Sequence, residues 1–544
     1  MENDDETFLI SHMKSGERNR GKELYRQLRG LPWKQLWTVE AARFDQASPQ
    51  ERSARVAVIR AVGVVFGETG AMEQKDEVRR WLLALLHDPC EKARRYAMAA
   101  LPKIGSYPND EAELISLLRT TSSPREKKFV GQTLEKIGGS ATLEMMRQTT
   151  TGILQSGSGV SPLAQSRDGP ATLLPQVGQK ILARLARGEH PSAIRPGNIL
   201  SNFAGLRLHL RGRRGLEGMV RDEVEASARK HGKFRVAETG SGLVGITPVA
   251  PFSLADVYAL RCFGTIGFVL GTVPASNEAL APVIAAELTR RILRTFTEGT
   301  VRYRLNFVSK GHQRSAVRLL ATQIYALCPE LLNDGSDVTW TVDIHPAGRG
   351  QCVELRPNMT PDPRFYYRKD DVPAASHPQL AACLARLAAR VEHEIVWDPF
   401  CGSGLELIES ALLGGVQSIY GTDLRADAIA IARANFAAAK IEPVPLNFSC
   451  GDFRDFARCE GLGPNSVTLI ITNPPMGKRV IIDDLPRLMA DLFNVAAQAL
   501  KPGGRLVFAN PLRMEKPHPL LKLQSRQVVD FGGFDCRMEK YVKI

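Results

Sequence analysis

The sequence predicts a multidomain protein with an α-helical N-terminal region, an α+β middle module and a C-terminal α/β domain built on a doubly wound parallel sheet. With 544 residues, 44% of them hydrophobic, the chain exceeds what one core usually serves and can fill several. Helical periodicity dominates the first part, whereas strand-like and helix-like runs alternate from Ile395 onward. The predicted parts are a helical domain at 1–149, a linker and helical connector at 150–200, the middle module at 201–360 and the α/β domain at 361–544.

Amphipathic helical stretches separated by short polar turns fill the N-terminal region from about Ala54 to Gly139. Two of them end in Lys-Ile-Gly, and the isoleucines, Ile104 and Ile137, are 33 residues apart. Such a period is typical of helix pairs that bury their apolar faces against neighbouring pairs. This part resembles HEAT-like repeats, and an ordinary helical domain is the alternative. We expect it to serve a protein or RNA partner.

Residues 150–172 are rich in Gly, Ser and Pro and lack apolar periodicity, which predicts a linker, and a basic helical stretch follows at 179–187. The middle module then mixes both periodicities and is expected to contain two small sheets. Its predicted strands are 206–210, 234–236, 243–246, 301–308, 338–344 and 351–356, and its predicted helices are 215–230, 277–297 and 312–327.

The C-terminal domain alternates strands and helices in the order expected of a doubly wound sheet. Its predicted strands are 395–398, 417–422, a strand before Asp452, 467–472 and 504–509, and its predicted helices are 404–414, 426–438 and 484–500. Sheets of this type bind ligands beyond the carboxyl ends of their strands.

A glycine-rich loop, Asp398 to Gly404, follows the first strand of this domain. Its glycines let the backbone approach a ligand closely, and its acid suits S-adenosylmethionine, which carries a sulfonium and an ammonium rather than phosphates. Asp423 ends the second strand 19 residues after Gly404, where it can bind ribose hydroxyls. Asp452 and Phe453, after the third strand, can contact adenine. The candidate cofactor residues are Asp398, Pro399, Phe400, Cys401, Gly402, Ser403, Gly404, Asp423, Leu424, Asp452, Phe453 and Asn473.

The turn Asn473-Pro474-Pro475-Met476 follows the fourth strand and is the predicted catalytic segment. An exocyclic amine on a base is a poor nucleophile, because its lone pair is delocalised into the ring. The side-chain carbonyl of Asn473 and the backbone carbonyl of Pro474 can accept hydrogen bonds from that amine, so that alignment and electrostatics carry the catalysis. Two prolines stiffen the turn and remove competing donors.

Residues 395–510 resemble class I S-adenosylmethionine-dependent methyltransferases of the Asn-Pro-Pro type, which have a Rossmann-like fold. The segment from Arg356 to Pro378 resembles the one that precedes the catalytic domain in THUMP-containing guanine-N2 RNA methyltransferases, and residues 206–270 are similar to the ferredoxin-like part of those enzymes. The resemblance implies methylation of guanine N2 in structured RNA, tRNA above all, with Ser376 in a segment that packs over the cofactor. Met476 departs from the family pattern, which has Tyr or Phe there to stack on the base.

A net charge of +13 favours a polyanionic partner. Candidate phosphate contacts are Arg211, Arg213, Arg214, Lys478 and Arg479. The nine cysteines are scattered without zinc-finger spacing, so that no metal or disulfide framework is expected. The sequence has neither an apolar run of membrane-spanning length nor the pattern of a signal peptide, and we expect a soluble, cytoplasmic protein.

Other functions use the same chemistry or the same surfaces. Guanine N2 in ribosomal RNA, adenine N6 in DNA or RNA, and protein glutamine are alternative methyl acceptors for an Asn-Pro-Pro turn, and only the middle module argues against the last two. A non-catalytic RNA-binding scaffold that relies on the helical region is the alternative of a different class.

Overall fold

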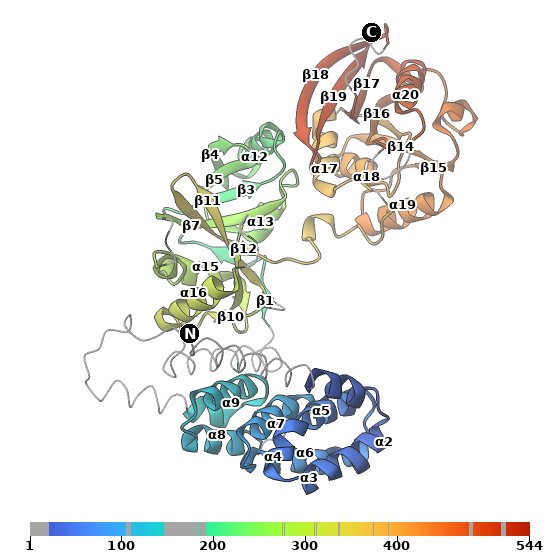
Figure 1. Ribbon diagram of the computed structural model, residues 1–544. Coiled ribbons are helices and arrows are strands. Elements are labelled where there is room, and N and C mark those ends of the chain that lie inside the picture. The colour runs from blue at the N-terminus through green and yellow to red at the C-terminus, as the bar shows by residue number, and fades with distance from the viewer. Residues whose placement is uncertain are drawn as a thin grey trace, which may run out of the picture. The chain divides into compact units, whose positions relative to one another are not determined.

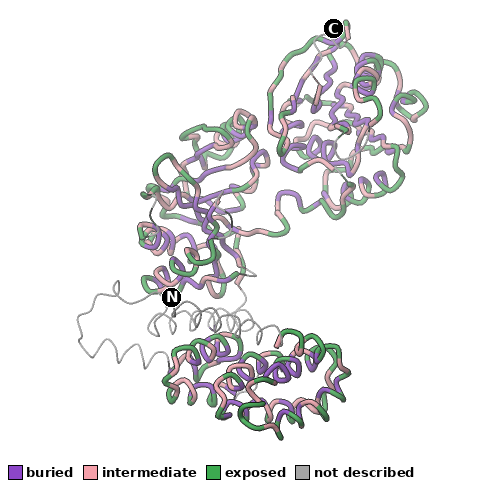
Figure 2. The backbone as a smooth tube through the Cα atoms, in the orientation of Figure 1, coloured by how far each residue is buried: buried purple, intermediate pink, exposed green. Residues whose placement is uncertain are grey.

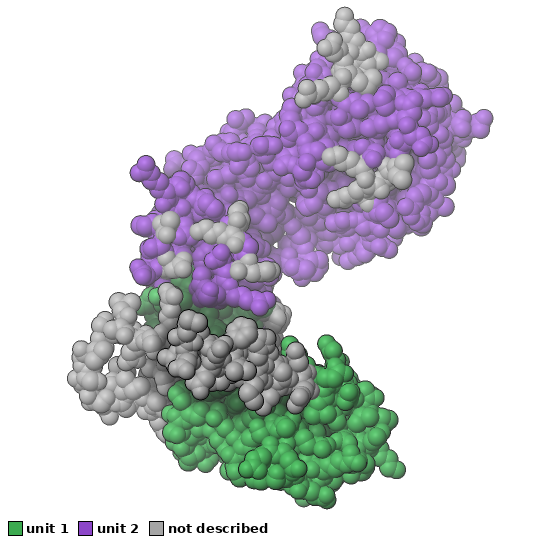
Figure 3. Space-filling view, viewed as in Figure 1, with its two compact units in different colours: residues 1–192, 318–337 green, residues 193–317, 338–544 purple. Residues whose placement is uncertain are grey.

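A computed structural model describes most of the chain and divides it into two compact units (Figure 3). The described residues are 21–104, 110–145, 181, 192–274, 276, 278–308, 311, 313–335, 338–373, 375–389, 391–477, 482–512 and 518–544. The first unit comprises Met1–Ser192 and Arg318–Asp337, and the second comprises Ala193–Val317 and Val338–Ile544. The predicted linker at 150–172 lies outside the described residues, and the three predicted boundaries between the four parts stay predictions.

The first unit is helical, as the sequence predicts. Its elements are α2 (Trp33–Gln35), η1 (Leu36–Ala41), α3 (Ala42–Gln46), α4 (Pro49–Arg55), α5 (Ala57–Thr69), η2 (Met72–Gln74), α6 (Lys75–Ala84), η3 (Leu85–His87), α7 (Glu91–Ile104), α8 (Asp110–Thr120), α9 (Pro124–Ile137) and strand β10 (Leu332–Asn333). Helix α7 packs between α5 and α9 (Figure 1). The ion pairs Arg52–Asp88 at 2.6 Å and Arg94–Glu126 at 2.5 Å link successive stretches. Their similar spacing suits stacked pairs, and the HEAT-like assignment stays a prediction.

The second unit begins with the mixed module. Its elements are β1 (Ala193–Ile194), β2 (Ile199–Leu200), β3 (Leu208–Arg211), α12 (Glu217–His231), β4 (Phe234–Gly240), β5 (Leu243–Pro248), β6 (Phe252–Ser253), α13 (Leu254–Tyr258), β7 (Thr265–Pro274), α14 (Leu280–Ile284), α15 (Glu287–Phe296), β8 (Thr297–Glu298), β9 (Arg302–Phe307), β11 (Trp340–Ala347) and β12 (Gly350–Pro357), and α16 (Arg314–Leu327) crosses the boundary between the units.

The expectation of two small sheets in this module is wrong. Within the second unit the predicted strands all lie in one sheet, in the order β9-β11-β12-β7-β3-β5-β4, and the short strands form two separate pairs, β1-β8 and β2-β6. Strand β7, which the sequence prediction missed, pairs with β3 on one side and with β12 on the other. Because β7 supplies ladder partners to both neighbours, the two halves fuse into one sheet.

The C-terminal domain is a seven-stranded sheet with helices on its faces (Figure 1). Its elements are η5 (Pro363–Phe365), α17 (Pro378–Ala388), β13 (Glu394–Asp398), α18 (Leu405–Leu413), β14 (Val416–Asp423), α19 (Ala426–Ala439), β15 (Leu446–Cys450), η6 (Phe453–Arg458), β16 (Val467–Thr472), α20 (Leu485–Ala499), β17 (Leu500–Asn510), β18 (Leu521–Asp530) and β19 (Asp535–Lys543). The predicted strands from 395 to 509 are confirmed. The final hairpin, β18 and β19, was missed, and it makes the sheet mixed because β19 is antiparallel to β17.

The core of this domain lies along its central strands (Figure 2). Val396, Trp397, Ile470 and Ile471 have no exposed surface. Such near-continuous apolar strands are typical of a parallel sheet covered on both faces.

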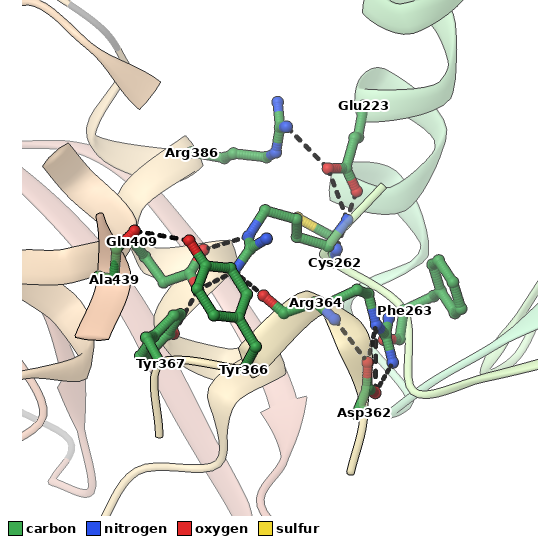
Figure 4. Close-up of polar contacts among 11 residues, drawn as sticks. Glu223, Cys262, Phe263, Asp362, Arg364, Tyr366, Tyr367, Arg386, Glu409 and Ala439 are labelled. Atoms are coloured by element: carbon green, nitrogen blue, oxygen red, sulfur yellow. Dashed lines mark hydrogen bonds and ion pairs between the residues drawn. The ribbon is translucent and has the colours of Figure 1, made fainter. Parts of the chain in front are cut away.

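Buried ion pairs join the mixed module to the C-terminal domain. Arg261 donates two hydrogen bonds of 2.7 Å to Glu409, and Glu223 accepts from the Arg261 and Cys262 amides and pairs with Arg386 (Figure 4). Burial lowers the pKa of Arg261, but the hydrogen bonds and charge of Glu409 raise it above the ordinary value. A buried charge whose partner is removed is costly, so this clasp resists opening.

A second contact joins the turn before α12 to β18. Gly215 has a φ of +94°, and a Cβ built there would lie 2.0 Å from the carbonyl oxygen of Val528. The Arg213 guanidinium donates to the carbonyl of Asp530, and Arg214 pairs with Asp535 at 3.1 Å. Only glycine allows this approach of two backbones.

One face of the mixed sheet carries a polar network centred on Glu354. Arg211 and the Nδ1 of His209 donate to its carboxylate, and the Nε2 of His209 lies 3.1 Å from Glu238. His209, Cys352 and Glu354 offer donor atoms close enough for a metal ion. However, the protons of Arg211 and His209 already occupy the Glu354 oxygens, which makes the group an ion-pair network.

Gly215→Ala should destabilise the second unit by about 2 kcal/mol or more, because both the left-handed backbone and the contact with Val528 are incompatible with a Cβ. Hydrogen exchange of the β18 amides in the full-length protein measures the effect. Gly218→Ala is the control: a Cβ there meets nothing within 4 Å. That helical substitution should stabilise by about 0.5–1 kcal/mol. Equal exchange in both variants would contradict the packing argument.

Glu354→Gln should cost most stability between pH 4.5 and 6.5. Burial lowers the pKa of His209, but hydrogen bonds with Cys352 and Glu354 raise it from 6.5 to about 9. The contribution of His209 to stability is therefore complete below pH 6.5 and is lost as the pH rises through 9. Burial raises the pKa of Glu354, but Arg211 and His209 lower it from 4.5 to about 2. The contribution of Glu354 to stability is therefore complete above pH 4.5 and is lost as the pH falls through 2.

At pH 6 we expect a loss of about 3 kcal/mol in Glu354→Gln, measured by hydrogen exchange of the β3 and β12 amides. Glu238→Gln is the matched control, because Glu238 is half-exposed and bonds only the outer nitrogen of His209. Its effect should be smaller at every pH. A loss in Glu354→Gln that does not vary with pH would rule out the assigned charges.

Candidate active site

The sheet order places the carboxyl ends of five parallel strands, β13 to β17, at one edge of the sheet. It reads β15-β14-β13-β16-β17-β19-β18 and reverses between β13 and β16. Asp398 is paired with Gly421, Asp423 with Cys450, and Trp397 with Ile470. The loops after β13 and β16 therefore diverge from neighbouring strands, and such a reversal point is where ligands bind in open α/β sheets.

Backbone and side-chain hydrogen bonds shape the loop after β13. The Cys401 amide donates to the carbonyl of Thr422, and the Gly402 amide donates to Oδ2 of Asp423 at 3.0 Å. The Ser403 hydroxyl donates to Asp371. Gly404 has a φ of +82°, and a Cβ there would press on Ala432 and Phe436 of α19. The loop thus enters α18 through a turn that requires glycine.

Asp398 is fully buried, and its carboxylate is only half satisfied. Its Oδ1 accepts from the Phe400 amide at 2.9 Å, whereas its Oδ2 makes no hydrogen bond of good geometry among the described residues, although the Thr472 hydroxyl is close enough to lower the pKa of the carboxyl. Burial raises the pKa of Asp398 well above its ordinary value, and the negative charges of Glu406 and Asp423 raise it further. A buried group of acids with an open oxygen favours a cationic ligand, which fits the sulfonium and ammonium of S-adenosylmethionine.

The other predicted cofactor residues line the neighbouring strand ends. Asp423 accepts from the Gly402 and Arg425 amides, and the adjacent Leu424 is 72% exposed, an apolar side chain left uncovered at the loop. Asp452 instead caps η6 and pairs with Arg454 at 2.8 Å. Phe453 is buried and packs on Phe400 with ring centroids 4.7 Å apart. Pro399 directly follows Asp398 in the loop after β13. The site assignments stay predictions.

In the Asn-Pro-Pro turn, the side-chain amide of Asn473 is held by a hydrogen bond at its nitrogen, whereas its oxygen is left without one. The Asn473 Nδ2 donates to Oγ of Ser376 at 2.8 Å, and its buried Oδ1 has no partner among the described residues. Pro474 is buried, and Pro475 and Met476 are half-buried. An unpaired buried carbonyl is costly unless a ligand supplies a donor, which an exocyclic amine can do.

The predicted RNA contacts divide into two groups. Arg211 is bound to Glu354, Arg213 to Asp530 and Arg214 to Asp535, so each has an intramolecular partner that would compete with a phosphate for its N–H donors. Lys478 and Arg479 lie outside the described residues. The role of all five in RNA binding stays a prediction.

Sequence reasoning missed Glu406, in the first turn of α18. It is buried, and it accepts a hydrogen bond from Ser376. Burial raises its pKa, while the bond from Ser376 opposes that shift. An acid two residues after Gly404 reads as an ordinary helix-start residue, since the macrodipole favours acids there, so the signal was hidden in a common pattern.

Comparison with known proteins places the C-terminal domain. Residues 366–538 match the model of the RMKL-like methyltransferase domain family. A probable tRNA (guanine(10)-N2)-dimethyltransferase of Methanothermococcus thermolithotrophicus is 27% identical over 148 residues, which cover 27% of this chain and 87% of that protein. The tRNA (guanine(10)-N2)-dimethyltransferase of Methanothermobacter thermautotrophicus is 27% identical over 185 residues, covering 34% of this chain and 49% of that one.

Among solved structures, TrmN from Thermus thermophilus has a TM-score of 0.49 at 20% identity and covers 62% of this chain and all of that one, 100%. The methyltransferase domain implies S-adenosylmethionine as the cofactor, as predicted. None of the helices among the described residues is both long and apolar enough to cross a membrane.

Asp423→Ala should weaken S-adenosylmethionine binding by about tenfold or more, because it removes the acceptor for the Gly402 and Arg425 amides as well as the predicted ribose contact. Isothermal titration measures the affinity. Asp427→Ala is the control, because Asp427 is fully exposed and pairs only with Arg425 and its own helix start. Unchanged affinity in Asp423→Ala would remove this residue from the cofactor site.

Proposed function

We propose that this protein is an S-adenosylmethionine-dependent RNA methyltransferase that modifies the exocyclic N2 amine of guanine in tRNA. The observation that carries the proposal is the open Oδ1 of Asn473, at the loop that neighbours buried Asp398 across the reversal point of the sheet. One group needs a hydrogen-bond donor, and the other favours a cation. An amine and a sulfonium are the two reactants of amine methylation.

The residues present can hold the reactants and align them. When bound, S-adenosylmethionine supplies an electrophilic methyl group on a positively charged sulfur. Asp398 would bind the cationic part and Asp423 the ribose. Asn473 Oδ1 and the Pro474 carbonyl would accept hydrogen bonds from the guanine amine, which turns its lone pair away from the ring and toward the methyl carbon. Fixed acceptors also stabilise the positive charge that develops on the amine.

The relatives support the choice of substrate. Both curated relatives act, by name, on guanine 10 of tRNA at N2, and that position is the first to examine here. The net charge of +13 suits a polyanionic substrate. The base has to leave its stack to reach the turn, and half-buried Met476 offers a polarisable side chain to cover it.

Asn473→Ala should lower kcat for methyl transfer by about 100-fold or more while cofactor affinity stays within about twofold, because the lost carbonyl contacts the acceptor amine. The assay incubates full-length protein with tRNA and labelled S-adenosylmethionine and identifies the methylated nucleoside by mass spectrometry. Asn447→Ala, at an exposed position of the edge strand β15, is the matched control.

Label in N2-methylguanosine or its dimethyl form is the expected result. If the label appeared in N6-methyladenosine, adenine and not guanine would be the substrate. No transfer to any RNA, together with no binding of S-adenosylmethionine, would leave a scaffold role instead. Full activity in Asn473→Ala would remove the proposed alignment.

A further inference from the structure

Three side chains from distant parts of the sequence form a partly buried chain of hydrogen bonds that ends at a buried carboxylate. Asn473, after β16, donates from Nδ2 to Oγ of Ser376 at 2.8 Å. Ser376, just before α17, donates its hydroxyl proton to Oε1 of Glu406 in α18. Glu406 is 4% exposed, and Asn473 Oδ1 is buried without a partner among the described residues.

The direction of these bonds follows from donor chemistry. An ionised Glu406 only accepts, so in that form the single proton of the Ser376 hydroxyl is committed to its carboxylate. The hydroxyl can then offer Asn473 only its lone pairs, and these require the NH₂ side of the amide. The flipped amide would place Oδ1 against a hydroxyl with no proton left to give, and it would present NH₂ to the acceptor amine.

We propose that Ser376 and Glu406 are positioning residues that fix the Asn473 amide with its carbonyl oxygen toward the acceptor amine. The inference rests on the proposed function and deepens its catalytic site. Neither side chain needs to touch the reacting atoms. Without this chain of bonds the two amide orientations differ little in energy, and only one of them accepts from an amine.

The test measures methyl transfer to tRNA by the full-length protein at saturating S-adenosylmethionine. Ser376→Ala should lower kcat by about tenfold or more, with KM for tRNA within about twofold. Ser376→Thr keeps a hydroxyl and should restore most of the rate. Ser466→Ala is the control, because its hydroxyl only closes a turn with Gly463, and it should match the wild type.

A double-mutant cycle separates the chain of bonds from simple loss of packing. Glu406→Leu removes the acceptor that holds the Ser376 proton and should lower kcat. Leucine has a volume similar to that of glutamate, so it should fill the same buried position. If both residues act through Asn473, the double variant Ser376→Ala with Glu406→Leu should be no slower than Ser376→Ala alone. The inference would be overturned if the kcat losses of the two single variants multiplied in the double variant, or if Ser376→Ala were fully active. Either result would leave the proposed function intact.

Two further readouts do not depend on turnover. Calorimetry with S-adenosylhomocysteine separates the positioning role from the cofactor contact that the resemblance implies for Ser376: an affinity within about twofold of the wild type in Ser376→Ala supports positioning, and a larger loss contradicts it. In protein labelled with ¹⁵N-asparagine, the Asn473 side-chain amide protons should exchange slowly in the wild type and faster in Ser376→Ala. If the wild type methylates no tRNA, the proposed function fails, and this exchange alone decides whether the amide is fixed. Equal exchange in both proteins would reject the positioning role.

Discussion

The reversal of strand order between β13 and β16 is the constraint on which the candidate site depends. Neighbouring parallel strands whose following helices cover opposite faces send their loops apart, and this divergence leaves a crevice at the carboxyl ends of the strands where a ligand can bind. The register pairs Trp397 with Ile470, so Asp398, the last residue of β13, lies opposite Ile471, and Asn473 follows two residues later in the loop after β16. Acid and amide are neighbours because the sheet is wound in two directions.

Much of the C-terminal domain could be predicted because its signals are local. Strands such as Val467–Thr472 are apolar runs with clear ends, and Gly402 and Gly404 mark a turn by their chemistry. Strand β7 was missed because Gly267 and Gly271 interrupt its pattern, and its role depends on two partners distant in the sequence. The clasp between Arg261 and Glu409 and the bond between Ser376 and Glu406 join residues that no periodicity links. Pairings of this kind require coordinates.

The mixed module is attached to the C-terminal domain by buried charge. Glu409 accepts from Arg261 and from the Tyr367 hydroxyl, and Glu223 accepts from two backbone amides and Arg386 (Figure 4). Buried networks of this type bring little net stability but penalise every alternative arrangement, because any slip leaves a charge unpaired. An RNA held by the mixed module would therefore meet the Asn473 turn in one defined register, which a flexible linker could not provide.

The acids of the site connect cofactor binding with the orientation of the amide. Burial raises the pKa of Asp398 and of Glu406, so each carboxylate is costly while the site lacks a counter-charge. A cation bound beside Asp398 favours the ionised forms of both groups by linkage. The ionised Glu406 is also the form that accepts a hydrogen bond from Ser376. Because this bond uses the hydroxyl proton of Ser376, the hydroxyl oxygen can only accept from Nδ2 of Asn473, which fixes the orientation of the amide. On the proposed function, the positive charge of the cofactor would thus also strengthen the hydrogen bonds that orient the carbonyl of Asn473, and we expect the site to be best ordered when the cofactor is bound.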